Sequence, residues 1–201
     1  MKKLLSKAIG SFLSLLFKMG ALDDILNIVN SVGIHKSLVP GDMIRQVLAK
    51  AVPGDIILVK AFGEATSLLI GGDYTHSAMV VSEKNLIADA TGALGVSKRD
   101  ILNLFQGISA IRLIRLKDAT DGEMVDIVDK ASFYTTKKIR YDYGYASNKE
   151  EMYCSEFLSH VINDILPGTL ELRPRFGKAT ITPDDLSKAS RIFDTVFEYR
   201  T

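Results

Sequence analysis

The chain has almost none of the residues that build covalent or metal crosslinks, since it holds one cysteine in 201 residues. A single cysteine excludes an intrachain disulfide and any zinc site built on several cysteines. No run of 18 or more apolar residues occurs, so a conventional membrane-spanning helix is not expected. The net charge of +1 gives no reason to expect a nucleic-acid partner. With 47% hydrophobic and 24% charged residues and no internal repeat, the composition is that of a globular protein of one ordinary domain.

The first 39 residues are interpreted as an N-terminal amphipathic helical segment, ahead of a domain at residues 40–201. Helical projection gathers the apolar residues on one face, opposite the basic and polar residues Lys3, Lys7, Ser11, Ser14 and Lys18. Three interpretations stay open: packing on its own domain or a partner chain, binding to a membrane surface, or a signal peptide. The lysines inside the apolar stretch argue against the signal peptide. Residues 1–20 are therefore expected to contact a membrane surface or a partner protein.

Strand and helix patterns alternate through the remaining chain and predict an α+β fold. Strands are expected at residues 56–59, 76–81, 86–91, 108–116 and 193–199. Helices are expected from Pro40-Gly41-Asp42, over 98–106, over 121–135, from Cys154 to Pro167, and from Thr182, which is a good N-cap before Pro183. The helix over 121–135 is predicted to bury Met124, Val125, Val128, Ala131 and Phe133.

Cys154 stands where a helix is expected to begin, in Tyr153-Cys154-Ser155-Glu156-Phe157. A helix N-terminus carries partial positive charge and unpaired N–H groups, and both stabilise a thiolate. At helical spacing the thiol shares a face with Phe157, Leu158, Val161 and Ile165, so it is expected to point toward the sheet. His160 lies about 120° away around the same helix and is interpreted as a surface residue, as is His35. Glu156 is expected to stabilise the first turn of the helix.

A partner for the thiol must come from elsewhere, and His76 begins an apolar strand far upstream. On the residues alone, His76 is either the general base for a thiol nucleophile or a core or turn histidine. The next strand, Leu86-Ile87-Ala88-Asp89-Ala90-Thr91, carries one acid among apolar residues. A buried acid needs a partner, and a histidine on the adjacent strand would supply it, unless Asp89 faces solvent at a sheet edge. Cys154, His76 and Asp89 are therefore the candidate catalytic residues.

Four segments together resemble the circularly permuted branch of NlpC-type papain-like cysteine hydrolases, the YiiX/YebB-like group. They are Pro53-Gly54-Asp55-Ile56-Ile57, Tyr74-Thr75-His76-Ser77-Ala78-Met79-Val80, Leu86 to Thr91, and Tyr153-Cys154-Ser155-Glu156-Phe157 after a Tyr- and Asp-rich loop. The element from Thr182 to Leu186 resembles that branch as well. In the permuted branch the histidine precedes the cysteine, as it does here. The resemblance implies a papain-like core in which an antiparallel sheet packs on the cysteine-bearing helix.

The resemblance also implies roles for the residues in the matching segments. Cys154 would be the nucleophile, His76 the base and Asp89 the residue that orients the imidazole. The backbone N–H of Cys154 would stabilise the oxyanion, with hydroxyls of Tyr74 and Tyr153 as further candidates for oxyanion or substrate binding. The implied reaction cleaves an amide or ester bond through an acyl-enzyme and needs no metal or organic cofactor.

The implied substrates are cell-wall peptides or lipid-linked amides and esters. The amphipathic N-terminus favours a location at the cell envelope, a membrane or a virion over a purely cytoplasmic one. Acyl transfer is the alternative reaction, since the same fold performs it. A different class of function also stays open: a structural, assembly or membrane-associated protein that retains the papain-like fold.

Overall fold

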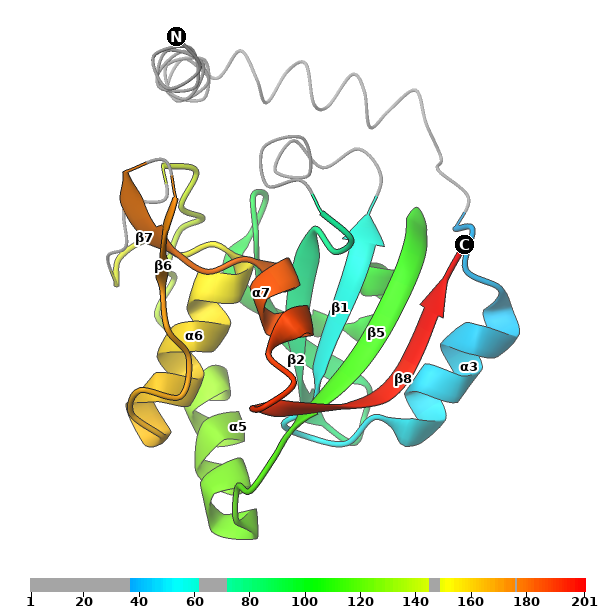
Figure 1. Ribbon diagram of the computed structural model, residues 1–201, viewed down its shortest axis with the longest axis horizontal. Helices are drawn as coiled ribbons and strands as arrows, with labels where there is room; N and C mark the ends of the chain where they lie inside the picture. Colours follow the sequence, from blue (N-terminus) through cyan, green and yellow to red (C-terminus); the bar gives the residue numbers. More distant parts are fainter. Residues whose placement is uncertain (1–36, 62–71, 145–148, 176) are drawn as a thin grey trace, which may run out of the picture.

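The computed structural model describes residues 37–61, 72–144, 149–175 and 177–201, and the predicted N-terminal helical segment lies almost entirely outside them (Figure 1). The described chain is a mixture of helices and antiparallel strands, which confirms the predicted α+β class. Its centre is a six-stranded antiparallel sheet in the order β4-β3-β2-β1-β5-β8. Strands β6 (Arg173–Arg175) and β7 (Lys178–Thr180) form a separate small hairpin.

Five strands of the main sheet lie where the sequence predicts them, whereas β4 is not predicted. The strands of this sheet are β1 (Ile56–Ala61), β2 (His76–Ser82), β3 (Leu86–Thr91), β4 (Gly95–Asp100), β5 (Ile108–Leu116) and β8 (Phe193–Arg200). The helices are α3 (Gly41–Lys50), α5 (Asp121–Thr135), α6 (Cys154–Ile165) and α7 (Pro183–Lys188), with one 3-10 turn, η1 (Ile101–Phe105). Among the described helices, none is long and apolar enough to cross a membrane.

One predicted helix is wrong: residues 98–106 do not form it. Lys98, Arg99 and Asp100 finish strand β4, and the short η1 turn follows. Strand β4 pairs along its whole length with β3, from Leu86 with Asp100 to Thr91 with Gly95. Backbone pairing with a neighbouring strand outweighs the weak helical spacing of this stretch.

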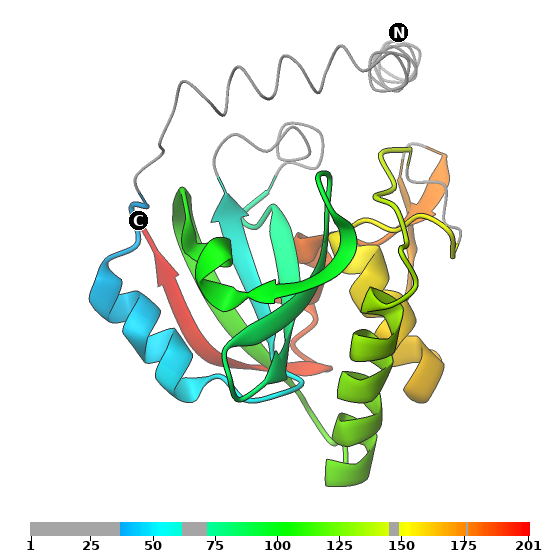
Figure 2. The same ribbon diagram turned by 180° about the vertical axis from the view of Figure 1, so that it is seen from behind.

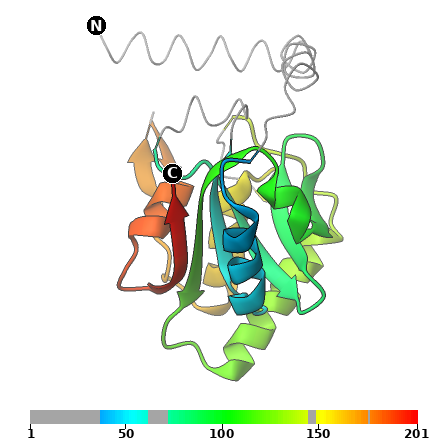
Figure 3. The same ribbon diagram turned by 90° about the vertical axis from the view of Figure 1, so that its right-hand side faces the viewer.

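Two hydrophobic cores fill the two faces of the sheet. In Figures 1 and 2, α5 and α6 lie beside each other on one side of the sheet, and in Figure 3 α3 lies in front of the sheet while α5 and α6 lie behind it. Successive side chains of a strand point to opposite faces of the sheet, so alternate residues of each strand belong to the two cores. Met79, Ala88 and Leu58 face α5 and α6, whereas Ala78, Val80 and Ile57 belong to the core beneath α3 and η1.

Helix α5 begins and ends where predicted, and its predicted buried set is right in part: Ala131 is buried and Met124 and Val128 pack against the core. Ile127, Ala131 and Tyr134 are buried, whereas Val125 and Phe133 are more than half exposed. The spacing of 127, 131 and 134 keeps one face toward the sheet, and Val125 and Phe133 lie on other sides of the helix.

Candidate functional site

His76 and Asp89 meet on neighbouring strands. Strand β2 pairs with β3 in the register Met79 to Ala88, so Asp89 lies diagonally across from His76 on the same side of the sheet. His76 Nε2 lies 2.7 Å from Asp89 Oδ2. Both side chains are buried, His76 with 3% and Asp89 with 0% of its surface exposed. The acid therefore faces a histidine and not solvent, and it fixes the ring through Nε2.

A third side chain, Arg99, joins this pair from strand β4. Arg99 Nε lies 3.1 Å from both carboxylate oxygens of Asp89, and one terminal nitrogen donates to Oδ2 at 2.5 Å. Burial raises the pKa of Asp89, but the hydrogen bonds and charges of His76 and Arg99 outweigh it, so this pKa lies below its ordinary value. Sequence reasoning missed Arg99 because it assigned this residue to a helix. A buried acid needs a positively charged or hydrogen-bonding partner, and this requirement could have indicated Arg99 from the sequence.

Cys154 is the first residue of α6, as predicted, and is buried with 1% of its surface exposed. The helix packs against β2 and β3, the strands that carry His76 and Asp89. Figure 1 shows its first turn at the end of the sheet where β1 finishes and β2 begins. The apolar stripe is also as predicted: Phe157, Leu158 and Val161 are fully buried.

The two candidate elements approach from different layers. Alternation puts His76 and Asp89 on the side of the sheet that carries Ala78 and Val80, while the stripe of α6 covers the opposite side. Cys154 lies at the end of the helical layer, because it is the first residue of α6. Any contact between the thiol and the imidazole therefore forms at the end of the sheet and not across its face.

The two neighbours of Cys154 fasten it to the C-terminal part of the chain. The hydroxyl of Tyr153 accepts a hydrogen bond from the backbone N–H of Ile181 at 3.1 Å. The hydroxyl of Ser155 donates to the carbonyl of the same Ile181 at 2.8 Å. Because both bonds are buried, they hold the backbone on either side of the thiol.

The segment that begins at Ile181 also reaches the strand that carries His76. Its Asp184 accepts hydrogen bonds from the backbone N–H groups of Asp73 and Tyr74, at 3.0 and 2.9 Å. The approach is close, since a Cβ on Gly72 would lie 2.4 Å from Asp184 Oδ2. This segment, which resembles the permuted branch in sequence, therefore ties the start of α6 to the start of β2.

Tyr74 is buried and its hydroxyl has a partner away from Cys154. The hydroxyl donates to Glu198 at 2.8 Å, and the guanidinium groups of Arg200 and Arg112 lie 5.2 and 6.0 Å from the ring centroid. Burial, followed by the hydrogen bond to Glu198, raises the pKa of Tyr74 to about 12. The phenol is therefore neutral at physiological pH and is fixed in a network with strand β8.

Asp55 of the Pro-Gly-Asp segment is also buried, but its partners are structural. Its carboxylate accepts from Arg115 at 2.7 and 2.8 Å and from the backbone N–H of Val52 at 2.9 Å. The preceding Gly54 has a φ of +94°, a conformation that favours glycine. This segment forms the turn that leads into β1.

Glu156 is the third residue of α6, and it is buried with 1% of its surface exposed. Its Oε2 accepts from the backbone N–H of Tyr153 at 3.4 Å. Among the described residues, Oε1 has no hydrogen-bond partner, and His160 Nε2 lies 3.8 Å from it. Burial raises the pKa of Glu156, His160 lowers it and Asp142 raises it again, with a net pKa above the ordinary value.

We expect Glu156→Gln to stabilise the protein at pH 8 relative to the wild type, and to do so less at pH 4. The folded state holds the proton of Glu156 more tightly than the unfolded chain does, so the wild type loses stability as the pH rises from about 4.3 through the raised pKa. Urea unfolding at both pH values measures the difference.

Glu123→Gln is the matched control, because Glu123 is the corresponding acid of α5. Its hydrogen bonds to the backbone and side chain of Thr120 lower the pKa of Glu123. This variant should therefore lose stability at pH 8. A Glu156→Gln protein that also lost stability at pH 8 would contradict the assignment.

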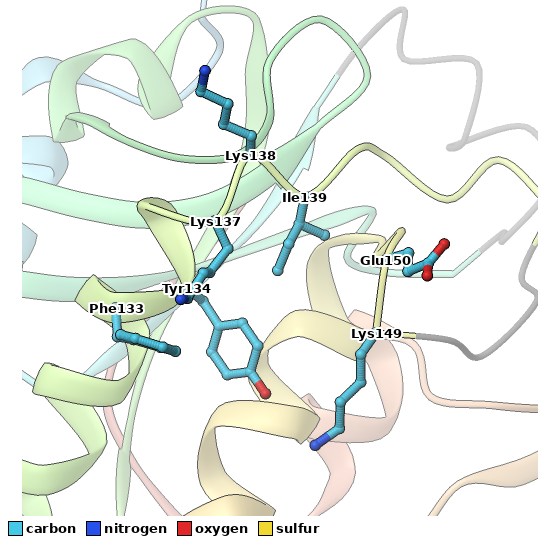
Figure 4. Close-up of a pocket in the computed structure, with 7 residues that line it drawn as sticks. All are labelled: Phe133, Tyr134, Lys137, Lys138, Ile139, Lys149 and Glu150. Carbon is cyan, nitrogen blue, oxygen red and sulfur yellow. The ribbon is translucent and has the colours of Figure 1, made fainter.

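A pocket of about 460 Å³ lies at the C-terminal end of α5, away from the candidate catalytic side chains (Figure 4). Its three lysines do not converge: Figure 4 shows Lys138 pointing away from Tyr134, while Lys137 Nζ lies 4.2 Å from the ring centroid of Phe133. Lys149 lies 3.5 Å from Asp164. Within the described ranges, no group of three or more His, Cys, Asp or Glu side chains is placed to hold a metal ion.

Comparison with known proteins places the chain in a family. The family model described as permuted papain-like amidase enzyme, YaeF/YiiX, C92 family, matches residues 50–198, more than half of the chain. A solved structure, the "metalloprotein yiiX from Escherichia coli O157:H7, DUF1105", is 19% identical, with a TM-score of 0.62, and the match covers 76% of this chain and 99% of that one. A search of curated proteins finds no match.

These findings confirm the predicted YiiX-like, permuted papain-like resemblance. The NlpC-type label is slightly off, because the matching family is C92. The structural likeness, at its low identity, supports the fold. The chain belongs to the C92 family of permuted papain-like amidase enzymes of the YaeF/YiiX type.

Proposed function

We propose that this amidase-family protein cleaves an amide or ester bond by nucleophilic attack of the Cys154 thiolate. The observation that supports this most directly is the 2.7 Å contact between His76 and Asp89, on strands against which the cysteine-bearing helix packs. A buried histidine held by a buried carboxylate is the arrangement that orients a general base. The family match supports the reaction class.

The proposed proton route follows from which ring nitrogen Asp89 binds. Asp89 holds Nε2, so Nδ1 takes the thiol proton. The thiolate then attacks the carbonyl carbon, a C–S bond forms, and the carbonyl electron pair moves to the oxygen. The protonated ring returns its proton to the leaving amine or alkoxide as the C–N or C–O bond breaks, which leaves a thioester on Cys154.

The second half of the proposed reaction regenerates the thiol. His76 takes a proton from water, the hydroxide attacks the thioester carbonyl, and the C–S bond breaks as Cys154 regains its proton. In acyl transfer, another nucleophile replaces the water. The backbone N–H of Cys154, at the start of α6, is the proposed donor to the oxyanion in both halves. Tyr74 and Tyr153 are proposed to shape this region, since their hydroxyls bond to Glu198 and Ile181.

The proposed substrates are cell-envelope peptides or lipid-linked amides and esters. We also propose that residues 1–20, with their basic amphipathic sequence, bring the enzyme to a membrane surface or to a partner. That segment lies outside the described residues, so its sequence pattern is the support.

The test is to incubate the full chain with muropeptides and with lipid amides and to follow both products and the protein mass. We expect the wild type to release an amine and to carry a transient acyl mass on Cys154, whereas Cys154→Ala should show neither. Ser159→Ala, a buried change on the same helix, is the control for packing. Supplying an amine acceptor separates transfer from hydrolysis by the identity of the product. If a folded wild type formed no acyl-enzyme with either substrate class or with a thiol-reactive acyl probe, the structural or assembly function would be favoured.

A further inference from the structure

Arg99 lies on β4, an outer strand of the main sheet, and contacts the buried Asp89. Its side chain is 19% exposed, and its planar group donates to both oxygens of a carboxylate that is completely buried. Two N–H groups directed at one carboxylate form the strong, geometrically specific arrangement of which arginine is capable. The carboxylate is the one that also holds His76 at 2.7 Å.

A carboxylate shared between a histidine and an arginine acts differently from one paired with the histidine alone. An Asp–His pair without other charges favours a protonated ring, because the negative charge stabilises the imidazolium. A permanent positive charge on the same carboxylate offsets that attraction and also repels a proton on the ring. The arginine also fixes the orientation of the carboxylate.

We propose that Arg99 is a positioning residue of the site, which holds Asp89 toward His76 and offsets part of the carboxylate charge, so that the ring can accept a proton at neutral pH. Its importance for turnover rests on the proposed function. Its effect on the ring does not, because the three side chains and their contacts are present whatever the substrate.

The charged groups around His76 support this assignment. Asp89 comes from β3 and Arg99 from β4, while the apolar Val59 of β1 pairs with His76.

On the side of the sheet that carries His76, the buried side chains of α3 and η1 are apolar: Val47, Ile101, Leu104 and Phe105. Arg99 is a cation in direct contact with the carboxylate of the His76–Asp89 pair.

The experiment measures the titration of His76 by NMR in the full chain carrying Cys154→Ala, which removes the thiol and any need for turnover. The chain has three histidines, and loss of one signal in His76→Gln assigns the resonance. We expect Arg99→Gln to move the titration midpoint of His76 upward by about half a pH unit or more. Arg99→Lys retains the charge and should move it less. Lys98→Gln removes an equal charge from the exposed neighbouring position on β4 and should leave it unchanged.

An Arg99→Gln protein with an unchanged or lowered midpoint would overturn the proposal. So would an Arg99→Lys protein that shifts as far as Arg99→Gln, because the offsetting charge would then be irrelevant. Chemical shifts of residues distant from β4 show whether each variant is folded. If Cys154 proved not to form an acyl-enzyme, the proposed function would fail while this titration could still succeed, so the two failures are distinguishable.

Discussion

His76→Ala is expected to slow acylation of Cys154 at pH 7 by about 10³-fold, the middle of the range for loss of a general base. Without the ring, the thiol keeps its proton and the leaving group receives none. The rate of appearance of the acyl mass, with an activated ester or amide probe in excess, measures the effect. Asp89 keeps its bonds to Arg99 in this variant, so the buried carboxylate remains compensated and the protein should stay folded.

His160→Ala is the matched control for that experiment. His160 lies on the same helix as Cys154, with its side chain 24% exposed, and its ion-pair partner is Glu156 at 3.8 Å. Its removal should leave the acylation rate within about twofold of the wild type, since it has no role in the proposed proton transfer. If His76→Ala and His160→Ala reacted equally fast, His76 would not be the base.

Asp89→Ala is expected to destabilise the protein by about 3–5 kcal/mol, the cost of removing one partner from a buried charged pair. Both His76 and Arg99 would lose their acceptor, and Arg99 is largely covered. Denaturant unfolding at pH 7 measures the loss. Acylation should also slow, because the ring is no longer oriented.

One further variant separates charge from hydrogen bonding. Asp89→Asn keeps one acceptor oxygen and should lose less stability than Asp89→Ala. The lowered pKa of Asp89 means that its carboxylate stabilises the fold above a pH of about 4, and that this contribution disappears as the pH falls through the depressed pKa. The difference in free energy of unfolding between the wild type and Asp89→Asn should therefore become smaller at acidic pH.

Asp194→Ala is the control for removal of a paired aspartate. Its side chain is 69% exposed and lies 3.1 Å from Lys117 Nζ. The expected cost is below about 1 kcal/mol, because an exposed ion pair contributes little. An equal cost at positions 89 and 194 would contradict a buried, compensating role for Asp89.

Local patterns were sufficient to predict where the candidate residues lie. The apolar stripe behind Cys154 predicted the helix and its first residue, and the turn before Leu86 predicted the hairpin that brings Asp89 beside the histidine strand. Both patterns lie within about ten residues of the element they predict, so they can be recognised without knowing any contact between distant segments. The exposed faces of α5 were harder to predict, because several of its sides carry apolar residues.

The sequence by itself determined the α+β class, the helix that begins at Cys154, and the strands that carry His76 and Asp89. The tertiary structure decided which charges compensate the buried acid, since Arg99 reaches Asp89 only because β4 pairs with β3. It also decided what surrounds the site. Glu198 accepts a hydrogen bond from the hydroxyl of Tyr74, which lies 124 positions earlier in the chain. The backbone of Ile181 forms hydrogen bonds with the side chains of both neighbours of Cys154. These partners depend on strand order and on packing between distant segments, whereas hydrophobic periodicity reports the neighbours of a residue along its own element.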